Sequence, residues 1–499
     1  MYTEGFMQEN LRQQRFQRGH PFGRGCGGQS PPLKLQTVTK KQAGVMAMGR
    51  IFGKNGMRGL AVTEFTCELA MQIGRAAAKV LAAHKDKRTK ILIGKDMRSS
   101  SDTIEAALCA GICSAGADAE LLGEVPVPAL AWHIKQREAC GGIMITASHV
   151  GAEFNGIKLF SSYGYRLGDD REEEMERLIL DAPDELEPEQ RRRYGRVIRC
   201  ETALDEYTDH LKKIAPADLS GIKVAVDCAN GSTSLTAERI FSDLGAEVVM
   251  MGNTPDGLNI NSSGSTRIDS LMTFVTENEC QCGIAFDGGG ERCLAIDEEG
   301  SLVDGDVIIA ACAGYMREQG TLRNNSILVT QANNLGLLRF ARENGIGTAS
   351  APTGERSMMR RMLECGFSIG GDPSGHIIFP DDAPSADGQL TGIRLLEAMK
   401  ASGKKMSGLA SVIEKSPQVM INVPIEKKHR EVWKNDRAIT SVIDEFESIL
   451  GDEGRVVVRE TGKEPVIRIR IEGRDFSAIN KMALHIADTI RERLYTPDD

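Results

Sequence analysis

One pattern recurs three times along this chain: an apolar strand, a polar turn, an amphipathic helix, a glycine-containing turn and a second strand. The copies occupy residues 90–123, 222–252 and 326–352, and the third copy is the loosest. Strands and helices in this alternation are typical of parallel α/β units, in which helices cover the faces of a sheet. Three such copies predict three related mixed α/β domains.

The pattern changes after about residue 417. Three later segments alternate apolar and polar side chains, as half-exposed strands do, and two further segments have helical periodicity. The strands are expected at 418–425, 455–461 and 466–473, and the helices at 434–450 and 476–494. We therefore predict a smaller α+β domain at the C-terminal end of the chain.

These patterns divide the chain into a leader and four domains around a central cleft. The predicted limits are 1–47 for the leader, then 48–202, 203–306, 307–417 and 418–499. The leader has seven Lys or Arg residues against two acids and no helical apolar stripe, so we predict disorder. An upstream start codon before Met48 explains it better than an organelle transit peptide. Residues 172–195 are highly charged and predict a surface helix and connector.

Composition narrows the classes of partner. A length of 499 residues is too great for one hydrophobic core, which agrees with several domains. A net charge of −9 and only two Trp residues argue against a nucleic-acid surface, although a local basic cleft could still bind an anionic small molecule. No apolar run has the length of a membrane span. The twelve Cys residues lack zinc-site spacing, so we predict a cytoplasmic protein with reduced thiols.

The strongest local motif is GGIMITASHVGAEFNGIKLF, residues 141–160. An apolar strand leads into Ser148 and His149, and Lys158 follows after a loop. A serine at the end of a strand, with histidine and lysine nearby, can accept and donate a phosphoryl group. The simpler alternative is that Ser148 and His149 only close a turn.

A second motif lies in CGIAFDGGGERCLAIDEEGSLVDGD, residues 282–306. An apolar strand ends at Asp287, three glycines follow, and then Glu291 and Arg292. Alternate residues of a tight loop can direct carboxylates at one hard cation such as Mg²⁺. A nucleotide-binding glycine loop is a poorer interpretation of this motif, because G-x-G-x-x-G is absent and the acids would repel phosphate. A plain turn is the remaining alternative.

Two weaker motifs follow. In GGDPSGHIIF, residues 370–379, the side chains of Asp372, Ser374 and His376 could bind sugar hydroxyls.

In RETGKEPVIRIRIEG, residues 459–473, a turn of small residues is flanked by cations. Backbone N–H groups, a hydroxyl and guanidinium groups together can hold phosphate. The residues concerned are Arg459, Thr461, Gly462, Lys463 and Arg468. A solvated charged loop is an equal alternative on this motif alone.

Together and in this order, the four motifs resemble those of the α-D-phosphohexomutases. That family has a T/S-A-S-H-N-P loop, a D-G-D-x-D-R loop, a G-E-x-S-G-H loop and an R-x-S-G-T-E-P loop. The resemblance extends from Gly49 to about Gly473, and segments 49–59, 155–167 and 254–271 are similar to the phosphoglucosamine mutases. It implies conversion of glucosamine 6-phosphate to glucosamine 1-phosphate through a phosphoserine, with glucose or mannose phosphates as the nearest alternatives.

The resemblance also implies roles for single residues. Ser148 would carry the phosphoryl group, and its phosphate would join Asp287 and Glu291 in binding one Mg²⁺ ion. Lys158 and Arg58 would form a basic pair near the reacting oxygen, with Lys158 a candidate general base.

His149 and Arg292 would complete the catalytic group. Asp372, Ser374 and His376 would bind the sugar, and the cradle of residues 459–468 would hold the second phosphate. A hexose 1,6-bisphosphate activator and a monomer or homodimer are expected.

The chain departs from the family pattern at sensitive positions. Gly289 replaces the middle Asp of the metal loop and Glu291 the third, so one carboxylate is lost. Because Mg²⁺ requires near-octahedral oxygen geometry, weaker or altered metal binding is expected. The other departures are Lys54, Asn55, Val150, Gly151, Asp372, Thr461 and Lys463. The alternative to a working mutase is a weakly active or inactive sugar-phosphate-binding paralogue with a regulatory role.

Overall fold

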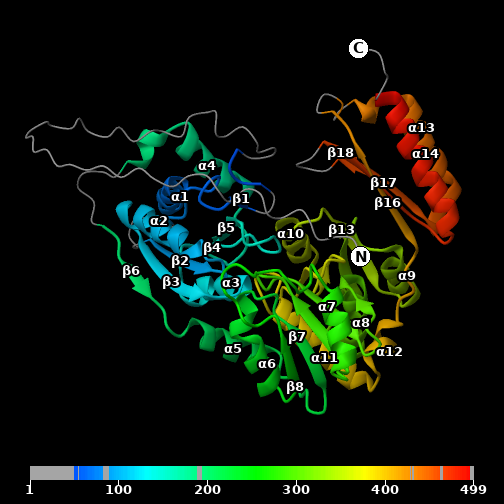
Figure 1. The fold of residues 1–499 in the computed structure, drawn as a ribbon, viewed down its shortest axis with the longest axis horizontal. Helices are drawn as coiled ribbons and strands as arrows, with labels where there is room; N and C mark the ends of the chain where they lie inside the picture. The colour runs from blue at the N-terminus through cyan, green and yellow to red at the C-terminus, as the bar shows by residue number, and fades with distance from the viewer. Residues whose placement is uncertain are drawn as a thin grey trace, which may run out of the picture. The chain divides into compact units, whose positions relative to one another are not determined.

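Four sheets organise the part of the chain that the computed structural model describes (Figure 1). That part comprises residues 50–53, 56–82, 89–187, 194–426, 429, 432–460 and 465–494. The predictions made for the leader and for Lys54, Asn55, Thr461, Gly462 and Lys463 lie outside these residues. Three sheets are mixed and accompanied by helices, and the fourth is small and antiparallel. This confirms the predicted α/β class with an α+β C-terminal part.

The first sheet has six strands in the order β1-β5-β4-β2-β3-β6. Its elements are β1 (Met57–Leu60), α1 (Cys67–Val80), β2 (Lys90–Lys95), α2 (Ser101–Ser114), β3 (Asp118–Glu124), α3 (Val127–Gln136), β4 (Gly141–Ile145), β5 (Phe154–Ser161), α4 (Asp169–Leu180) and β6 (Val197–Arg199). Strands β4, β2 and β3 are parallel, whereas β5 and β1 run antiparallel to their neighbours. Parallel strands end at one edge of a sheet, so the segments that follow β2 and β4 meet there.

The second sheet has the order β11-β10-β9-β7-β8. Its elements are α5 (Ala203–Ile214), β7 (Lys223–Asp227), α6 (Ala237–Asp243), β8 (Glu247–Met251), α7 (Asp269–Glu277), β9 (Cys282–Phe286), β10 (Cys293–Asp297) and β11 (Leu302–Val303). The tight turn between β9 and β10 contains the three glycines of the second motif. These two strands are completely buried, so the turn starts from a rigid base.

The third sheet has the order β13-β12-β14-β15. Its elements are α8 (Gly305–Glu318), β12 (Ser326–Thr330), α9 (Leu335–Glu343), β13 (Gly347–Ala351), α10 (Glu355–Cys365), β14 (Gly370–Gly371), β15 (Ile377–Ile378), α11 (Gly388–Ser402) and α12 (Met406–Ala410). All three recurring sequence copies therefore form the strand–helix–strand units predicted for them, around β2, β7 and β12.

The C-terminal sheet has the order β16-β18-β17 and is antiparallel. Its elements are β16 (Gln418–Pro424), α13 (Arg437–Leu450), β17 (Arg455–Glu460), β18 (Val466–Glu472) and α14 (Phe476–Leu494). Ile467, Ile469 and Ile471 of β18 are buried in a core to which α13 and α14 contribute, and Figure 1 shows these helices beside each other. The alternate residues of β18 are polar, so its other face presents charge.

Side-chain caps define several helix starts. A side-chain oxygen accepts a hydrogen bond from a backbone N–H of the first turn at Thr66, Asp304, Asn334, Asp387 and Asp436. Such caps satisfy N–H groups that have no partner within the helix. Two of them, Asp304 and Asn334, flank the second of the cavities described below.

Helix α4 is the surface helix predicted within residues 172–195, although one of its faces is buried. Its Met175, Glu176 and Leu178 are buried. The Glu176 carboxylate accepts hydrogen bonds from the backbone N–H groups of residues 50, 51 and 52 at 2.7–3.1 Å. The high charge density did not reveal that one of those charges holds the start of the first domain in place.

Among the described residues, no helix combines the length and the apolar character that crossing a membrane requires.

Candidate active site

Ser148 lies in the turn after β4 and is 5% exposed. Its φ of 56° is in the left-handed region, which is costly for a residue other than glycine. The Ser148 N–H donates to Thr146 Oγ1 at 2.8 Å, which helps to fix this conformation. The Oγ hydroxyl then lies 2.7 Å from Asp287 Oδ2 and 3.3 Å from Glu291 Oε2. A strained turn thus directs the serine oxygen at two carboxylates.

Two side chains hold this turn from outside. The Arg98 guanidinium donates to the carbonyls of Ser148 at 3.2 Å and Val150 at 2.8 Å, and it also bonds to the carboxylate of Asp96. Asn261 Nδ2 donates to the same two carbonyls at 2.8 and 2.9 Å. Arg98 is buried and lies just after β2, where the sheet edge places it beside the end of β4.

The β9–β10 turn supplies the facing carboxylates. Asp287 Oδ1 accepts from the N–H groups of Glu291 at 2.9 Å and Arg292 at 3.1 Å, which leaves Oδ2 directed at Ser148. Asp287 and Glu291 are 0% and 2% exposed. A Cβ atom built on Gly289 would lie 3.2 Å from Glu291 Oε2 and 3.7 Å from the Ser148 Cα. A carboxylate at position 289, which the family pattern has and this chain lacks, would therefore face Ser148 as Asp287 and Glu291 do.

Lys158 on β5 reaches this cluster from the first sheet. The register of β4 and β5 pairs Met144 with Lys158, and Lys158 is 5% exposed. Its Nζ ammonium donates a short hydrogen bond to Glu291 Oε2. Burial alone would raise the pKa of Glu291, but the Lys158 charge outweighs it and the pKa is lowered. Glu291 therefore stays ionised, and its buried Oε1 atom has no hydrogen-bond partner.

The donor set can be tested against Mg²⁺. Among the described residues, no group of three or more His, Cys, Asp or Glu side chains could hold a metal ion. Two carboxylates and the Ser148 hydroxyl do converge, and the orphaned Glu291 Oε1 is a hard oxygen donor of the kind that Mg²⁺ prefers. The residues fit a Mg²⁺ site with fewer protein ligands than the family pattern provides.

The charges of Arg58 and Arg292 act on the serine loop, and that of Arg58 also acts on the facing carboxylates. Burial, followed by the charge of Arg98, lowers the pKa of Arg58. Burial, followed by the charges of Arg292 and Arg58, lowers the pKa of His149 to about 4. His149 is therefore neutral near pH 7, and its Nδ1 atom has no partner. It can exchange hydrogen bonds with a ligand but adds no charge.

The turn between β14 and β15 contains the predicted sugar loop. Asp372 Oδ1 accepts from the Ser374 N–H at 2.9 Å and the Ser374 hydroxyl at 2.5 Å. His376 Nε2 lies 3.7 Å from Glu355 Oε2 of α10. Burial lowers the pKa of His376, but the Glu355 carboxylate outweighs it, so the pKa is raised. His376 and Glu355 form a buried ion pair when the imidazole is protonated.

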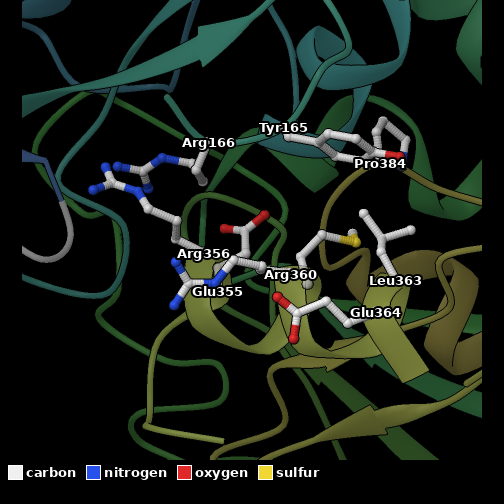
Figure 2. Close-up of a pocket in the computed structure, with 9 residues that line it drawn as sticks. Tyr165, Arg166, Glu355, Arg356, Arg360, Leu363, Glu364 and Pro384 are labelled. Atoms are coloured by element: carbon white, nitrogen blue, oxygen red, sulfur yellow. The ribbon is translucent and has the colours of Figure 1, made fainter. Parts of the chain in front are cut away.

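A cavity of about 310 Å³ extends beside Glu355 (Figure 2). It is lined by Tyr165, Arg166, Glu355, Arg356, Met359, Arg360, Leu363, Glu364 and Pro384. Glu355 is 8% exposed, and its Oε1 atom has no partner. The charges of Arg356 and Arg166 both act on Glu172, so the two guanidinium groups lie in one region. The cavity joins the first and third α/β units next to the sugar loop.

A second cavity, of about 290 Å³, lies where the third sheet meets the C-terminal sheet. Arg459 of β17 and Arg468 of β18 are cross-strand neighbours and both line it. Arg468 Nε donates to Asn422 Oδ1 at 2.9 Å. Pro373 of the sugar loop lines the same cavity, so the two weaker sequence motifs border one space.

Comparison with known proteins agrees with this geometry. The four parts of the phosphoglucomutase/phosphomannomutase family match in order: alpha/beta/alpha domain I at residues 49–185, domain II at 205–300, domain III at 304–416 and the C-terminal domain at 420–489. This chain belongs to that family.

Similar proteins include two bacterial phosphoglucosamine mutases. The one from Acetivibrio thermocellus is 44% identical over 448 residues, which cover 90% of this chain and 100% of the relative. The one from Caldicellulosiruptor saccharolyticus is 45% identical over 450 residues, with coverage of 90% and 100%. The chain therefore spans the full length of these relatives.

Solved structures share the fold at lower identity. A phosphoglucomutase/phosphomannomutase family protein from Burkholderia thailandensis gives a TM-score of 0.76 at 22% identity, covering 90% of this chain and 97% of that one. The Aspergillus fumigatus N-acetylphosphoglucosamine mutase, in complex with GlcNAc-6P and magnesium, gives 0.63 at 16% identity, covering 92% and 97%.

The site residues predicted for this phosphohexomutase form three groups. Ser148, Asp287, Glu291 and Lys158 meet in one buried cluster, and the charges of Arg58 and Arg292 act on the adjacent His149. The sugar loop holds Asp372, Ser374 and His376 in one turn. Arg459 and Arg468 line the second cavity.

Three residues of this phosphohexomutase site were not predicted from sequence: Arg98, Asn261 and Glu355. Asn261 lies in the segment 254–271 that carried part of the resemblance, yet its role needed the fold. Besides supporting the serine turn, its Oδ1 accepts from the Gly288 N–H at 2.9 Å. One amide therefore bridges the serine loop and the carboxylate loop.

Replacing Asn261 with aspartate tests this bridge. Aspartate tolerates the φ of 60° at this position and keeps the acceptor for Gly288, but it cannot donate to the Ser148 and Val150 carbonyls. The two carbonyls keep their Arg98 donor, but the new carboxylate oxygen faces them without a proton to donate. This should lower the free energy of unfolding by about 1–3 kcal/mol and slow turnover. Chemical denaturation and steady-state kinetics measure both. The control is Asn259→Asp at a half-buried position, where the amide loses a donor to the Thr254 carbonyl and contacts neither the Ser148 nor the Val150 carbonyl. Equal behaviour of the two variants would rule the bridge out.

Proposed function

We propose that this phosphohexomutase interconverts glucosamine 6-phosphate and glucosamine 1-phosphate, with Ser148 carrying the phosphoryl group. The observation that supports the proposal most directly is the 2.7 Å contact between Ser148 Oγ and Asp287 Oδ2 inside a buried cluster. The substrate class follows relatives that are 41–45% identical and named phosphoglucosamine mutases. Glucose and mannose phosphates remain the alternatives to be tested.

The reaction has two transfers. The C1 hydroxyl oxygen of glucosamine 6-phosphate attacks the phosphorus of phosphorylated Ser148; the P–Oγ bond breaks, and the proton of the hydroxyl passes by way of a general base to Ser148 Oγ. The resulting 1,6-bisphosphate turns over, and Ser148 Oγ attacks the C6 phosphorus. The P–O6 bond then breaks and O6 takes up the proton that Ser148 Oγ gives up, which releases glucosamine 1-phosphate and restores the phosphoserine. Such transfers depend mainly on positioning and charge neutralisation.

The chain's own groups provide much of that neutralisation. Lys158 donates to Glu291 beside Ser148 Oγ, so its ammonium lies next to the position of the phosphoryl group. To act as general base it must first give up a proton, which a nearby phosphate oxygen can accept. Arg58 and Arg292 contribute fixed charge near the same atoms. His149, neutral near pH 7, can accept a hydrogen bond from a sugar hydroxyl.

We further propose that one Mg²⁺ ion binds Asp287, Glu291 and a phosphoserine oxygen. When bound, the ion would neutralise charge on the transferring phosphoryl group. Because Gly289 offers no carboxylate and Lys158 already engages Glu291, we propose weaker metal binding than three carboxylates would give.

The remaining proposals concern the context of the reaction. We propose that a hexose 1,6-bisphosphate primes Ser148, and that the enzyme works in the cytoplasm as a monomer or homodimer. The second phosphate of the substrate would bind Arg459, Arg468 and the adjoining residues 461–463. Asp372, Ser374 and His376 would bind sugar hydroxyls. The domain limits 48–202, 203–306, 307–417 and 418–499 are retained as proposals.

Two measurements test the substrate and the intermediate together. Intact-mass analysis of protein incubated with glucose 1,6-bisphosphate should show an increase of about 80 Da, one phosphoryl group. Coupled assays on glucosamine, glucose and mannose 6-phosphates should give the highest kcat/KM for glucosamine 6-phosphate. A preference for glucose or mannose would correct the substrate. Absence of both the mass increase and any turnover would instead favour the inactive sugar-phosphate-binding paralogue.

A further inference from the structure

The polar face of the C-terminal sheet carries a group of charged side chains at each of its two ends. On β18, Arg468, Arg470 and Glu472 alternate with the buried isoleucines, so all three lie on the polar face. The β17 register places Arg459 opposite Arg468 and Arg455 opposite Glu472. Arg459 and Arg468 form the end assigned to phosphate. Arg455, Arg470 and Glu472 form the other end, which contacts the third sheet.

The contacts at this other end converge on one turn, residues 331–334, between β12 and α9. Arg470 donates to the Ala332 carbonyl at 2.7 Å and, by a short hydrogen bond, to the Gln331 carbonyl. Arg455 Nη2 donates to the Asn333 carbonyl at 2.6 Å. Three consecutive carbonyls are thus held by two guanidinium groups from the C-terminal sheet.

Glu472 completes the contact and is 1% exposed. Its Oε2 atom accepts from Arg455 Nη2 at 3.0 Å and from the Leu335 N–H at 3.0 Å. The Arg470 side chain is 11% exposed, and burial lowers its pKa although the Glu472 charge opposes this. Hydrogen bonds between ionised groups and backbone in such a desolvated place are strong and directional.

The receiving turn is itself rigid. Asn333 Oδ1 accepts from the Thr330 hydroxyl at 2.8 Å, and Asn333 Nδ2 donates to Asp306 Oδ1 at 2.7 Å. Asp306 Oδ2 accepts from the Asn334 N–H at 3.0 Å, and Asp306 is 1% exposed. Because its side chains bond inward, the turn presents its carbonyls outward in a fixed arrangement.

We propose that Arg470, with Arg455 and Glu472, is a positioning residue: it clamps the C-terminal sheet to the 331–334 turn and so places Arg459 and Arg468 at the substrate's second phosphate. The inference rests on the proposed function for the phosphate role of Arg459 and Arg468. Arg470 lines the same cavity as Arg459 and Arg468, but Nη1 and Nη2 of its guanidinium group both donate to carbonyls of the turn. Arg470 lies two residues from Arg468 on β18 and pairs with Val457 on β17. A displacement of Arg470 is therefore transmitted along these strands to the phosphate-binding end of the face.

The test compares Arg470→Met and Arg470→Lys in the full chain with Arg474→Met. Arg474 is an exposed arginine whose ion pair with Glu453 lies within the C-terminal domain, so it matches the change in charge without touching the clamp. In Arg470→Met, KM for the hexose 6-phosphate should rise about tenfold with a smaller change in kcat, since binding rather than chemistry is weakened. Arg470→Lys should recover most of the loss, and the control should match the unmodified protein.

Hydrogen exchange supplies a readout that needs no turnover. The Leu335 N–H donates across the contact to Glu472, so the peptide that contains it reports docking directly. Its exchange should accelerate about tenfold or more in Arg470→Met and stay unchanged in Arg474→Met, while peptides of β18 and α14 keep their protection. If exchange were faster in Arg470→Met but the unmodified protein had no mutase activity, the proposed function would be contradicted and the clamp would still be supported. Unchanged exchange and unchanged KM in Arg470→Met would overturn the clamp.

Discussion

Ser148→Ala should abolish phosphorylation and reduce turnover to background. The variant keeps the β4 turn, because the backbone contacts from Arg98 and Asn261 do not involve the hydroxyl. It removes the only atom of residue 148 that can form and break the P–O bond, and the adjacent Asp287 and Glu291 are carboxylates that would repel the phosphate. Loss of covalent catalysis of this kind typically costs several orders of magnitude in rate.

Intact-mass analysis after incubation with glucose 1,6-bisphosphate and a coupled assay measure the two effects. The control is Ser270→Ala, which removes an exposed hydroxyl on α7 whose one bond is to the Arg267 carbonyl. It should gain the same mass as the unmodified protein and retain its rate. A phosphorylated Ser148→Ala protein, or one with more than a small residual rate, would show that another residue carries the phosphoryl group.

The sequence predicted the outline of this site better than its interior. Local motifs located Ser148, Asp287 and Glu291, because short apolar strands followed by polar turns are visible in one dimension. The pairing of Lys158 with Glu291 depends on the antiparallel register of β4 and β5 and on two different sheets meeting, which no local pattern contains. Asn261 and Glu355 were missed for the same reason: each acts on a residue distant in sequence.

Charge patterns were the least reliable signal. The acidic segment around Glu176 predicted a surface helix, yet that carboxylate is buried and satisfies three backbone N–H groups. On β18, the alternation of Ile and Arg did predict a half-buried strand correctly. It could not show that Arg470, which lines the same cavity as Arg459 and Arg468, also bonds to the carbonyls of another sheet. Periodicity fixes the face of a strand, whereas the partner of that face depends on tertiary packing.

Gly289→Asp should restore tight Mg²⁺ binding and raise the Mg²⁺-dependent rate. The φ at Gly289 is accessible to other residues, and an added Cβ would meet Glu291 Oε2 and Val127 Cγ2 at 3.2 Å, so only small shifts are needed. The new carboxylate would then face Ser148 and Glu291. Without metal, a third buried carboxylate should destabilise the protein by about 1–3 kcal/mol through like-charge repulsion and desolvation.

With Mg²⁺ the effect of Gly289→Asp on stability should change from destabilising to stabilising. A ligand that binds only the folded state stabilises it in proportion to the logarithm of the ligand concentration over Kd. The unfolding temperature of Gly289→Asp should therefore lie below that of the unmodified protein in chelator, and it should approach or exceed that value in millimolar Mg²⁺. Titration calorimetry should show an affinity at least about tenfold higher, the change expected from one added carboxylate ligand worth more than ~1.4 kcal/mol.

Gly408→Asp is the matched control, since the same change on α12 has ordinary space around its Cβ and lies outside the site. Its stability should not respond to Mg²⁺ beyond that of the parent. If Gly289→Asp also failed to respond, the loss of this carboxylate would not be what limits metal binding. The competing cation at Glu291 would then be the limiting factor, and Lys158→Met in the Gly289→Asp background would have to recover the Mg²⁺ response.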